Sequence, residues 1–459
     1  MEANSVKQNK MGVMPIPKLL LNMAIPLTVS LIIQSLYNII DSLFLSYLGE
    51  NVLTAVSLAA TLQNLMSGTA SGIGVGITAL VAQYLGAKQR DKASRAAMNG
   101  ILVELFFVIL SMLAGTFLLR PFFRSQTQDE EIIRYGMQYL GICMICSVGM
   151  FGEVTLERIL NSTGRNAMTM LTQSAGAVIN VALDPLFIFA LNLGVRGAAL
   201  ATVLSQLMAM VLAYCLNRWK NPDLDITLRG FRPEGDMIFS ILRVGIPATF
   251  MSIVTSVMNF MINRLVTSFS TSAMAVYGIY AKLQHFVQSP LIGVSSSIVP
   301  IVAFSYGAKN RKRIMETLRW SMIYCFIVLG FAAFLFMAFP GQILSFFNPT
   351  EAMLEAGLPI FRIVGFTFLL SSPSQCCTST LQGIGNGTSS LIIIGARQVL
   401  VRLPLAYLFA HIGGLSMLWY CWPISELVSD IVACSLMAYM DKKKLRPMDR
   451  ALVENPQVG

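Results

Sequence analysis

Long apolar stretches recur along the whole chain, and they constrain its fold more than any single motif does. An apolar helix needs about 20 residues to cross the roughly 30 Å hydrocarbon core of a bilayer. Stretches of that length recur about twelve times, separated by short polar or Gly/Pro-containing connections. We place the predicted spans at 18–47, 53–84, 93–119, 132–156, 165–191, 195–217, 237–266, 273–304, 314–339, 354–381, 388–410 and 415–440.

Composition supports a membrane protein built of helices. The 459 residues are 55% hydrophobic and only 12% charged, with a mean hydropathy of +0.66, whereas charged residues make up about 25% of a soluble globular protein. Strands of an outer-membrane barrel would alternate apolar and polar residues, and stretches such as MLAGTFLL do not alternate. We therefore predict an all-α polytopic membrane protein with almost no chain left for a soluble domain.

The distribution of positive charge predicts the orientation. With the N-terminus inside, the cytoplasmic side takes 24 of the 33 Lys and Arg residues, and the opposite side takes five. Cytoplasmic loops are enriched in these residues, so we predict that both termini are cytoplasmic. The net charge of +10 then reflects topology, because basic runs such as GAKNRKR would face anionic membrane lipids. We expect no nucleic-acid partner.

The two halves of the chain resemble each other at an offset of 221 residues. The pairs at this offset are Ile25-Pro26 with Ile246-Pro247, Leu62-Gln63 with Leu283-Gln284, and Gly86-Ala87-Lys88 with Gly307-Ala308-Lys309. Six predicted spans precede the polar stretch 218–236 and six follow it, so both halves cross the membrane in the same direction. We predict two pseudo-symmetric six-helix bundles, an N-lobe at 1–217 and a C-lobe at 237–440, with a cytoplasmic linker at 218–236 and a cytoplasmic tail at 441–459.

Several motifs together resemble the multidrug and toxic compound extrusion (MATE) family. They are LGAKQRDK and YGAKNRKR after the second and eighth spans, the Ile-Pro pair near the start of each half, and LDPLFIFALNLGVRGAALAT. The resemblance covers nearly the whole chain and is strongest to the MepA-like and DinF-like bacterial branch. It implies the MATE fold, with twelve transmembrane helices in two lobes. It also implies a transporter of the bacterial plasma (inner) membrane that exports drugs, often cationic, in exchange for protons or sodium ions.

Acidic residues deep inside apolar spans each require a physical reason. A charge at the bilayer centre costs about 3 kcal/mol even on the lenient insertion scale, so such groups usually face a cavity or a partner. The clearest cases are Asp41, Glu104, Asp184, Glu426 and Asp430, with Glu153 near a cytoplasmic end.

Depth in the membrane predicts which acids can meet. At 1.5 Å per residue, Asp41 and Asp184 both lie roughly 10 Å below the outer ends of the first and fifth helices. Thr202 enters from the same side and reaches the same level, while Asn180 lies one helical turn from Asp184 on the same face. Pro185 cannot donate a hydrogen bond to the preceding turn, which frees a carbonyl and favours a kink.

These groups form an all-oxygen set. Such a set suits a hard monovalent cation, or two carboxylates that hold one proton between them because burial and repulsion disfavour two negative charges. The resemblance implies the same cation-binding residues, Asp41, Asn180, Asp184 and Thr202. Alternatively, Asn180 and Asp184 only brace helix packing through interhelical hydrogen bonds. We expect no cofactor beyond the coupling ion, H⁺ or Na⁺, and no metal beyond a possible sodium ion.

The second half differs in its charged residues. Its seventh and eleventh spans carry no carboxylate, and its tenth carries only Glu355, at its second residue. NorM-like relatives have acids in that lobe, so we expect no second cation site. Apart from basic residues assigned to the membrane surfaces, it holds Lys282, Arg362, Arg397 and Arg402 within its spans. They either line a basic cavity, or Arg397 and Arg402 pair with Glu426 and Asp430 on the twelfth helix. The second interpretation is favoured.

We therefore predict a cation-coupled multidrug exporter that works by alternating access, with small-molecule drugs and membrane lipids as partners and no obligatory protein partner. Candidate substrate-cavity residues are Gln34, Tyr37, Gln284 and Arg402. The alternative is a flippase for lipid-linked or other anionic amphipathic substrates, which basic residues in the second half would suit. Two isolated histidines and no HExxH-type motif argue against an enzyme.

Overall fold

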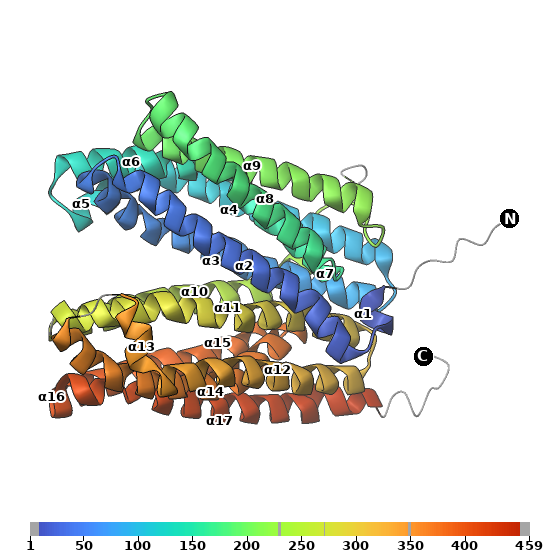
Figure 1. The fold of residues 1–459 in the computed structure, drawn as a ribbon. Helices are drawn as coiled ribbons and strands as arrows, with labels where there is room; N and C mark the ends of the chain where they lie inside the picture. The colour runs from blue at the N-terminus through green and yellow to red at the C-terminus, as the bar shows by residue number, and fades with distance from the viewer. Residues whose placement is uncertain (1–8, 228–230, 270, 348–349, 450–459) are drawn as a thin grey trace. The chain divides into compact units, whose positions relative to one another are not determined.

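The computed structural model describes residues 9–227, 231–269, 271–347 and 350–449, and the regular structure in these ranges is helical, without strands (Figure 1). The helices of the first half are α1 Lys10–Val13, α2 Ile16–Ser46, α3 Glu50–Gly86, α4 Arg90–Phe117, α5 Leu119–Gln126, α6 Glu130–Ile145, α7 Val148–Ser162, α8 Asn166–Pro185, the π-helix η1 Leu186–Ala190 and α9 Val195–Lys220. Those of the second half are α10 Gly235–Thr267, α11 Thr271–Gly307, α12 Arg311–Ala338, α13 Pro340–Ser345, α14 Glu351–Gly383, α15 Gly387–Gly395, the π-helix η2 Ala396–Arg402, α16 Leu403–Leu418, α17 Cys421–Met440 and the π-helix η3 Asp441–Leu445.

Each predicted span coincides with one helix or with a run of consecutive helices. Within the described ranges, ten helices are individually long and apolar enough to cross a membrane, and α6 with α7, bent by 47°, adds one more. The remaining predicted span, 354–381, matches α14, which is 33 residues long and carries the polar run SSPSQ in its second half. The predicted all-α membrane fold is confirmed.

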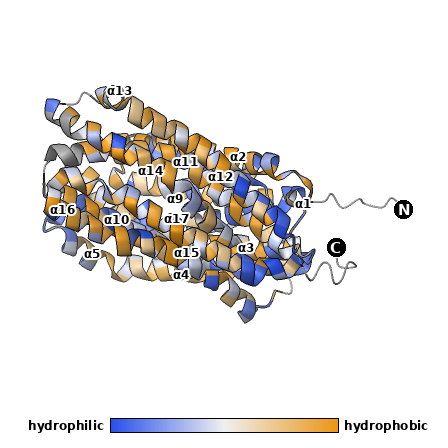
Figure 2. Ribbon diagram, turned by 90° about the horizontal axis from the view of Figure 1, so that it is seen from below, coloured by the Kyte–Doolittle hydropathy of each residue, from blue (hydrophilic) through white to orange (hydrophobic). Residues whose placement is uncertain are grey.

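The outer faces of the long helices are apolar rather than polar. On α4, the exposed large side chains Phe106, Ile109, Leu113 and Phe117 recur every three or four residues, and Phe117 is 70% exposed. This spacing places them on one helix face, which is suited to lipid rather than water. Figure 2 shows hydrophobic residues along the lengths of the helices and hydrophilic residues gathered near helix ends.

The internal repeat extends to the helix boundaries. The offset of 221 residues relates α3 to α11 and α4 to α12 at both ends, and it also relates the starts of α5 and α8 to those of α13 and α15. The backbone of the connecting turns repeats as well. Lys88 and Lys309, which follow α3 and α11, have φ angles of 59° and 54°, and Gly164 and Gly385 have φ angles of 79° and 83°. The duplication predicted from the sequence is therefore present in the backbone.

The two halves differ in one helix and share one irregular feature. In the first half, the chain breaks between α6 and α7 at Cys146 and Ser147, whereas its counterpart α14 continues as one helix. Each half also contains a π-helical segment beside a proline. In the first half it follows Pro185, and in the second half it precedes Pro404. A proline lacks the backbone N–H that continues an α-helix, and π-segments occur frequently at functional sites.

Two compact units can be distinguished, each described here by itself. The first contains Val29–Thr249, and the second contains Lys10–Thr28 together with the chain from Phe250 onward. Helices α2 and α10 are thus each divided between the units, while α9 ends at Lys220 and α10 begins at Gly235. The division of the chain at 217, 236 and 440 stays a prediction.

Packing inside each unit centres on a few helices. In the first unit, α3 contacts α4, α6 and α7, and α9 contacts α6, α7 and α8. In the second unit, α14 contacts α11, α12 and α17. One close approach in the first unit depends on glycine, because a Cβ at Gly197 would lie 2.6 Å from the carbonyl oxygen of Phe187. Gly197 therefore lets α9 lie directly against the π-segment η1.

The left-handed turn that occurs in both halves of the repeat predicts a stability effect. Gly385→Ala should lower the free energy of unfolding by about 1–2 kcal/mol, because a side chain disfavours the left-handed backbone that φ 83° requires. The matched control is Gly395→Ala in α15, where a Cβ meets nothing within 4 Å and stability should be unchanged or rise by up to about 1 kcal/mol. Thermal unfolding of the purified variants measures both. Equal stability of the two variants would contradict the prediction.

Candidate functional site

Four predicted site residues from three helices converge inside the first unit. Asp41 comes from α2, Asn180 and Asp184 from α8, and Thr202 from α9. The carboxyl groups of Asp41 and Asp184 lie close enough to interact electrostatically. The Asn180 amide donates to Asp184 Oδ2 at 2.9 Å, and its oxygen accepts from the backbone N–H of Thr202 at 3.2 Å. The structure thus brings together the residues that the depth comparison placed at one level, and their role as a cation site stays a prediction.

The site leaves acceptor oxygens without partners. Asp184 is 0% exposed and Asn180 is 1% exposed. Among the described residues, Oδ1 of Asp184 and Oδ1 of Asp41 are buried and accept no hydrogen bond. Thr202 Oγ1 lies 3.5 Å from the Asn180 amide and donates to the carbonyl of Ala198 at 3.0 Å. Buried acceptors of this kind suit a bound monovalent cation or a proton shared between the carboxyl groups.

The local backbone explains how α8 presents Asp184. Helix α8 ends at Pro185 and passes into η1, where the N–H of Leu191 donates to the carbonyl of Leu186 at 2.9 Å, a π-type spacing. The predicted irregularity at Pro185 therefore takes the form of a change from α to π hydrogen bonding. This change lies directly after Asp184, so the carboxylate stands where the helix is least regular.

A small polar cavity of about 90 Å³ adjoins the site. Its lining includes the predicted residues Gln34 and Tyr37, together with Asn180 and Thr202. The remaining lining residues are Glu153, Gln173, Gly176, Ala177, Ser205 and Gln206. The cavity thus extends the site along α8 toward α7.

Sequence reasoning missed Gln173 and Glu157. The hydroxyl of Thr172 donates to Glu157 Oε1 at 2.6 Å, and the Gln173 amide donates to Glu157 Oε2 at 2.8 Å. Gln173 stands seven residues before Asn180, two helical turns away on the same face of α8, and this spacing was the available signal. Glu157 gave no such signal, because its partners lie on another helix.

The other two predicted cavity residues lie in the second unit. Gln284 on α11 and Arg402 in η2 line a cavity of about 300 Å³. Amide and hydroxyl side chains are frequent in its wall, among them Asn259, Asn263 and Gln288. Gln34 and Tyr37 therefore line a cavity of one unit, and Gln284 and Arg402 line a cavity of the other.

The predicted pairing of the basic residues is correct for Glu426 and wrong for Asp430. Arg402 donates to Glu426 Oε1 at 2.7 Å, and Arg397 lies 3.3 Å from Glu426 Oε2. Asp430 instead accepts from the backbone N–H of Ser374 at 2.9 Å and makes no ion pair within 4 Å in the described ranges. Both guanidinium groups therefore share one buried carboxylate, while Asp430 binds the backbone of α14. Arg362 is exposed, and the side chain of Lys282 lies outside the described residues.

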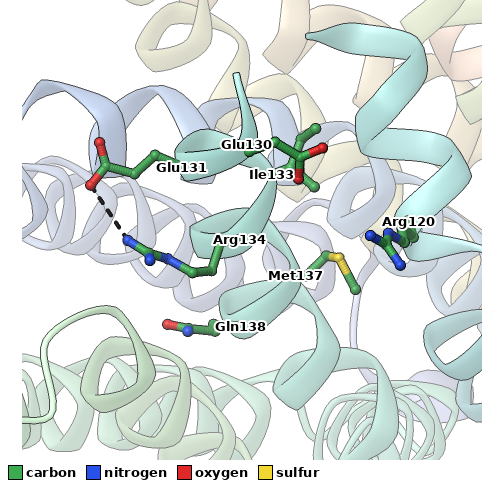
Figure 3. Close-up of a pocket in the computed structure, with 7 residues that line it drawn as sticks. All are labelled: Arg120, Glu130, Glu131, Ile133, Arg134, Met137 and Gln138. Carbon is green, nitrogen blue, oxygen red and sulfur yellow. Dashed lines mark hydrogen bonds and ion pairs between the residues drawn. The ribbon is translucent and has the colours of Figure 1, made fainter. Parts of the chain in front are cut away.

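A wide hollow of about 760 Å³ at α5 and α6 is a different kind of feature (Figure 3). It is lined by Arg120, Glu130, Glu131, Ile133, Arg134, Met137 and Gln138. Its charges are exposed and partly paired, as Glu131 with Arg134 at 3.5 Å. Exposed pairs of this kind are typical of a solvated helix end, so this hollow contributes no site chemistry.

The fold and the polar interior define a polytopic helical membrane protein with an internal two-fold repeat, and comparison with known proteins assigns its family. The sequence profile of the MatE family matches residues 26–186 and 247–408, one match in each half of the repeat. The chain therefore belongs to the MatE family and is a MATE transporter.

Relatives of known name match over nearly their whole length. The chain is 23% identical over 438 residues to multidrug export protein MepA of Staphylococcus saprophyticus subsp. saprophyticus, with 95% of this chain and 96% of the relative covered. It is 26% identical over 432 residues to the probable multidrug resistance protein YoeA of Bacillus subtilis, with 92% and 93% covered.

Solved structures of MATE transporters share the fold. The outward-facing conformation of a multidrug resistance MATE family transporter matches with a TM-score of 0.89 at 24% identity, covering 98% of this chain and all of the other. A transporter from Pyrococcus furiosus, described as having reversed polarity of its binding pocket, matches with a TM-score of 0.88 at 23% identity, covering 97% and 100%. The predicted MATE fold is confirmed.

The arginine pairs predict a stability effect in the second unit. Arg402→Ala should lower the free energy of unfolding by about 2 kcal/mol, because it removes the shorter of two bonds to the buried Glu426 and leaves only Arg397 to compensate that charge. The control Arg362→Ala changes an exposed arginine and should alter stability by less than about 0.5 kcal/mol. Thermal unfolding in detergent distinguishes them, and an Arg402→Ala protein as stable as the control would refute a structural pair.

Proposed function

We propose that this transporter exports amphipathic, often cationic, compounds in exchange for protons or sodium ions. The main support for this proposal is that Asp41, Asn180, Asp184 and Thr202 lie together. Two buried carboxylate oxygens in this group have no hydrogen-bond partner. The names of MepA and YoeA, a multidrug export protein and a probable multidrug resistance protein, support export of drugs.

The chemistry of the site supports coupling to a cation. Two carboxyl groups close together inside an apolar unit repel each other when both are charged, and a bound proton or sodium ion relieves that repulsion. Asn180 donates a hydrogen bond to Asp184 Oδ2, whereas Oδ1 of Asp184 and Oδ1 of Asp41 have no partner. Both Oδ1 atoms can therefore face the ion. The ion can drive transport only if it binds one conformation of the protein more tightly than the other. The ion would favour the conformation that holds Asp41 and Asp184 close together over one that separates them, because it relieves their repulsion only when they are close.

Charge-neutral variants test the site directly. Asp41→Asn and Asp184→Asn should each reduce ethidium export from vesicles by at least about tenfold, because an amide cannot exchange a proton or hold a cation with full charge. Asp236→Asn, at an exposed position at the start of α10, is the matched control and should transport normally. Both site variants have to insert at normal levels for the comparison. Undiminished export against a gradient by both variants would disprove the proposal.

Imposed gradients identify the coupling ion. Vesicles containing the purified protein receive a pH gradient in one experiment and a sodium gradient in another, and ethidium movement is followed by fluorescence. The gradient of the coupling ion should drive export and the other should not. Movement that follows neither gradient would exclude both ions as the energy source.

A flippase for lipid-linked or other anionic amphipathic substrates is the second candidate. Arg397 and Arg402 line the cavity of the second unit and would favour an anionic group. However, both arginines already compensate Glu426, which favours the structural interpretation. Transport of an anionic amphipath with no transport of ethidium would support the flippase instead.

We further propose that the protein lies in the bacterial plasma membrane with both termini in the cytoplasm. The excess of Lys and Arg in the predicted cytoplasmic connections supports this orientation. A fluorescent protein fused after Gly459 should fluoresce, and alkaline phosphatase fused there should be inactive. The same two fusions between α5 and α6 should give the opposite result. An active phosphatase at the C-terminus would contradict the proposed orientation.

A further inference from the structure

An apolar groove between α4, α7 and α9 of the first unit has no part in the cation site. Its volume is about 530 Å³, and residues 225–227, which follow α9, complete one end of it. Leu105, Val148 and Tyr214 line the groove and are 49%, 38% and 48% exposed, so it is open along its side. Leu105 directly precedes the exposed apolar stripe of α4 that begins at Phe106. The open side of the groove therefore continues a helix face that is suited to lipid.

The groove matches one leaflet of a bilayer in length. On α4 its lining runs from Met98 to Val108, and on α9 it runs from Met210 to Arg218. The ten residues on α4 rise roughly 15 Å at 1.5 Å per residue, which is half of the roughly 30 Å hydrocarbon core. Glu104 belongs to the wall, but both of its carboxylate oxygens are buried behind the surface. The accessible wall is thus mostly apolar and suits an extended hydrocarbon chain.

The end of the groove near the C-terminus of α9 carries residues typical of a membrane interface. Arg218 lies two residues before α9 ends at Lys220, and the neighbouring Trp219 is 76% exposed. Tyr214 lies one helical turn deeper than Arg218 on the same face. Tryptophan and tyrosine are enriched at the level of lipid headgroups. The groove therefore runs from the headgroup level toward the centre of the bilayer.

Two unlike charges at this end do not bind each other. Arg218 and Asp225 both line the groove and are exposed, and the described residues show no ion pair within 4 Å for either of them. Asp225 is held in place, because its backbone N–H donates to the Ser94 hydroxyl at 3.0 Å and the preceding Leu224 is buried in the core. The groove thus presents one positive and one negative group side by side at the headgroup level.

We propose that this groove binds a glycerophospholipid whose headgroup carries a primary ammonium group. Arg218 binds the phosphate, Asp225 accepts a hydrogen bond from the ammonium group, and one hydrocarbon chain lies along the apolar wall. A groove with an arginine alone would favour an anionic lipid, whereas two unlike charges match a headgroup that carries both signs. The groove shares no lining residue with the 90 Å³ cavity beside Asp184, and the proposal is independent of ion-coupled transport.

Thermal unfolding of the purified full-length protein in detergent, with added lipid, tests the headgroup preference. A lipid that binds the folded state raises the unfolding temperature in proportion to its affinity. Dioleoyl phosphatidylethanolamine should act at concentrations about fivefold lower than dioleoyl phosphatidylcholine, whose ammonium group has no proton to donate. Dioleoyl phosphatidylglycerol has the phosphate without an ammonium group, and it should also act about fivefold more weakly. Equal responses to the three lipids would overturn the proposal and indicate unspecific contact with bulk lipid.

Two charge-neutral variants assign the two halves of the headgroup. Asp225→Asn should abolish the preference for phosphatidylethanolamine over phosphatidylcholine and leave the response to phosphatidylcholine unchanged. Arg218→Gln should weaken the response to all three lipids about fivefold, because each of them carries a phosphate. The matched controls are Asp91→Asn and Lys220→Gln, which change exposed charges outside the lining and should respond as the parent does. A preference for phosphatidylethanolamine that survives in Asp225→Asn would contradict the assigned partner.

Two neighbouring tryptophan variants locate the hydrocarbon chain. Leu105 lines the groove, whereas Phe106 is 62% exposed and does not line it. Leu105→Trp should fill the groove and weaken the response to phosphatidylethanolamine about fivefold, which corresponds to about two methylene groups of lost burial. Phe106→Trp should leave the response unchanged. Equal responses of the two variants would place the lipid elsewhere on the protein and overturn the assignment to this groove.

Discussion

The hydrogen bond from Asn180 to Asp184 is the interaction on which the functional interior of the first unit depends. A carboxylate inside an apolar helical bundle has to receive its partners from the protein, because lipid supplies none. Asn180 gives Asp184 one partner and links it to the backbone of α9 at Thr202. The change to π hydrogen bonding after Pro185, and the close approach that Gly197 allows, place α8 and α9 where this link can form.

The two halves share a backbone and differ in their buried charges. Helix boundaries and left-handed turns repeat at 221 residues, with lysine at one pair of turns and glycine at another. The described interior of the first unit holds acids such as Asp41, Asp184 and Glu104, with Arg158 as a nearby base. The second unit instead neutralises Glu426 with two arginines. The two halves therefore share one backbone scaffold, and a few buried charged residues distinguish their interiors.

Predictions from the sequence succeeded where a single helix carried the information. Apolar runs predicted the spans, and residue counts from the helix ends placed Asp41, Asp184 and Thr202 at one depth. Pairing between helices was harder to predict. Asp430 stands one turn from Glu426, yet it binds the backbone of α14, because helix rotation decides which acid faces the arginines. Glu157 was missed for the same reason, since Thr172 and Gln173 reach it from a different helix.

The sequence by itself determined that the chain is a membrane protein, that it is duplicated, and that acids are buried in its first half. Apolar length, period and charge carry this information locally, because a span must exclude water wherever it packs. Only the tertiary structure decided which acids have partners. It brought Asp41 close to Asp184, placed Glu426 between two arginines, and left the Glu104 carboxylate without a hydrogen-bond partner. These outcomes depend on the rotation and approach of helices far apart in the chain, which no local pattern encodes.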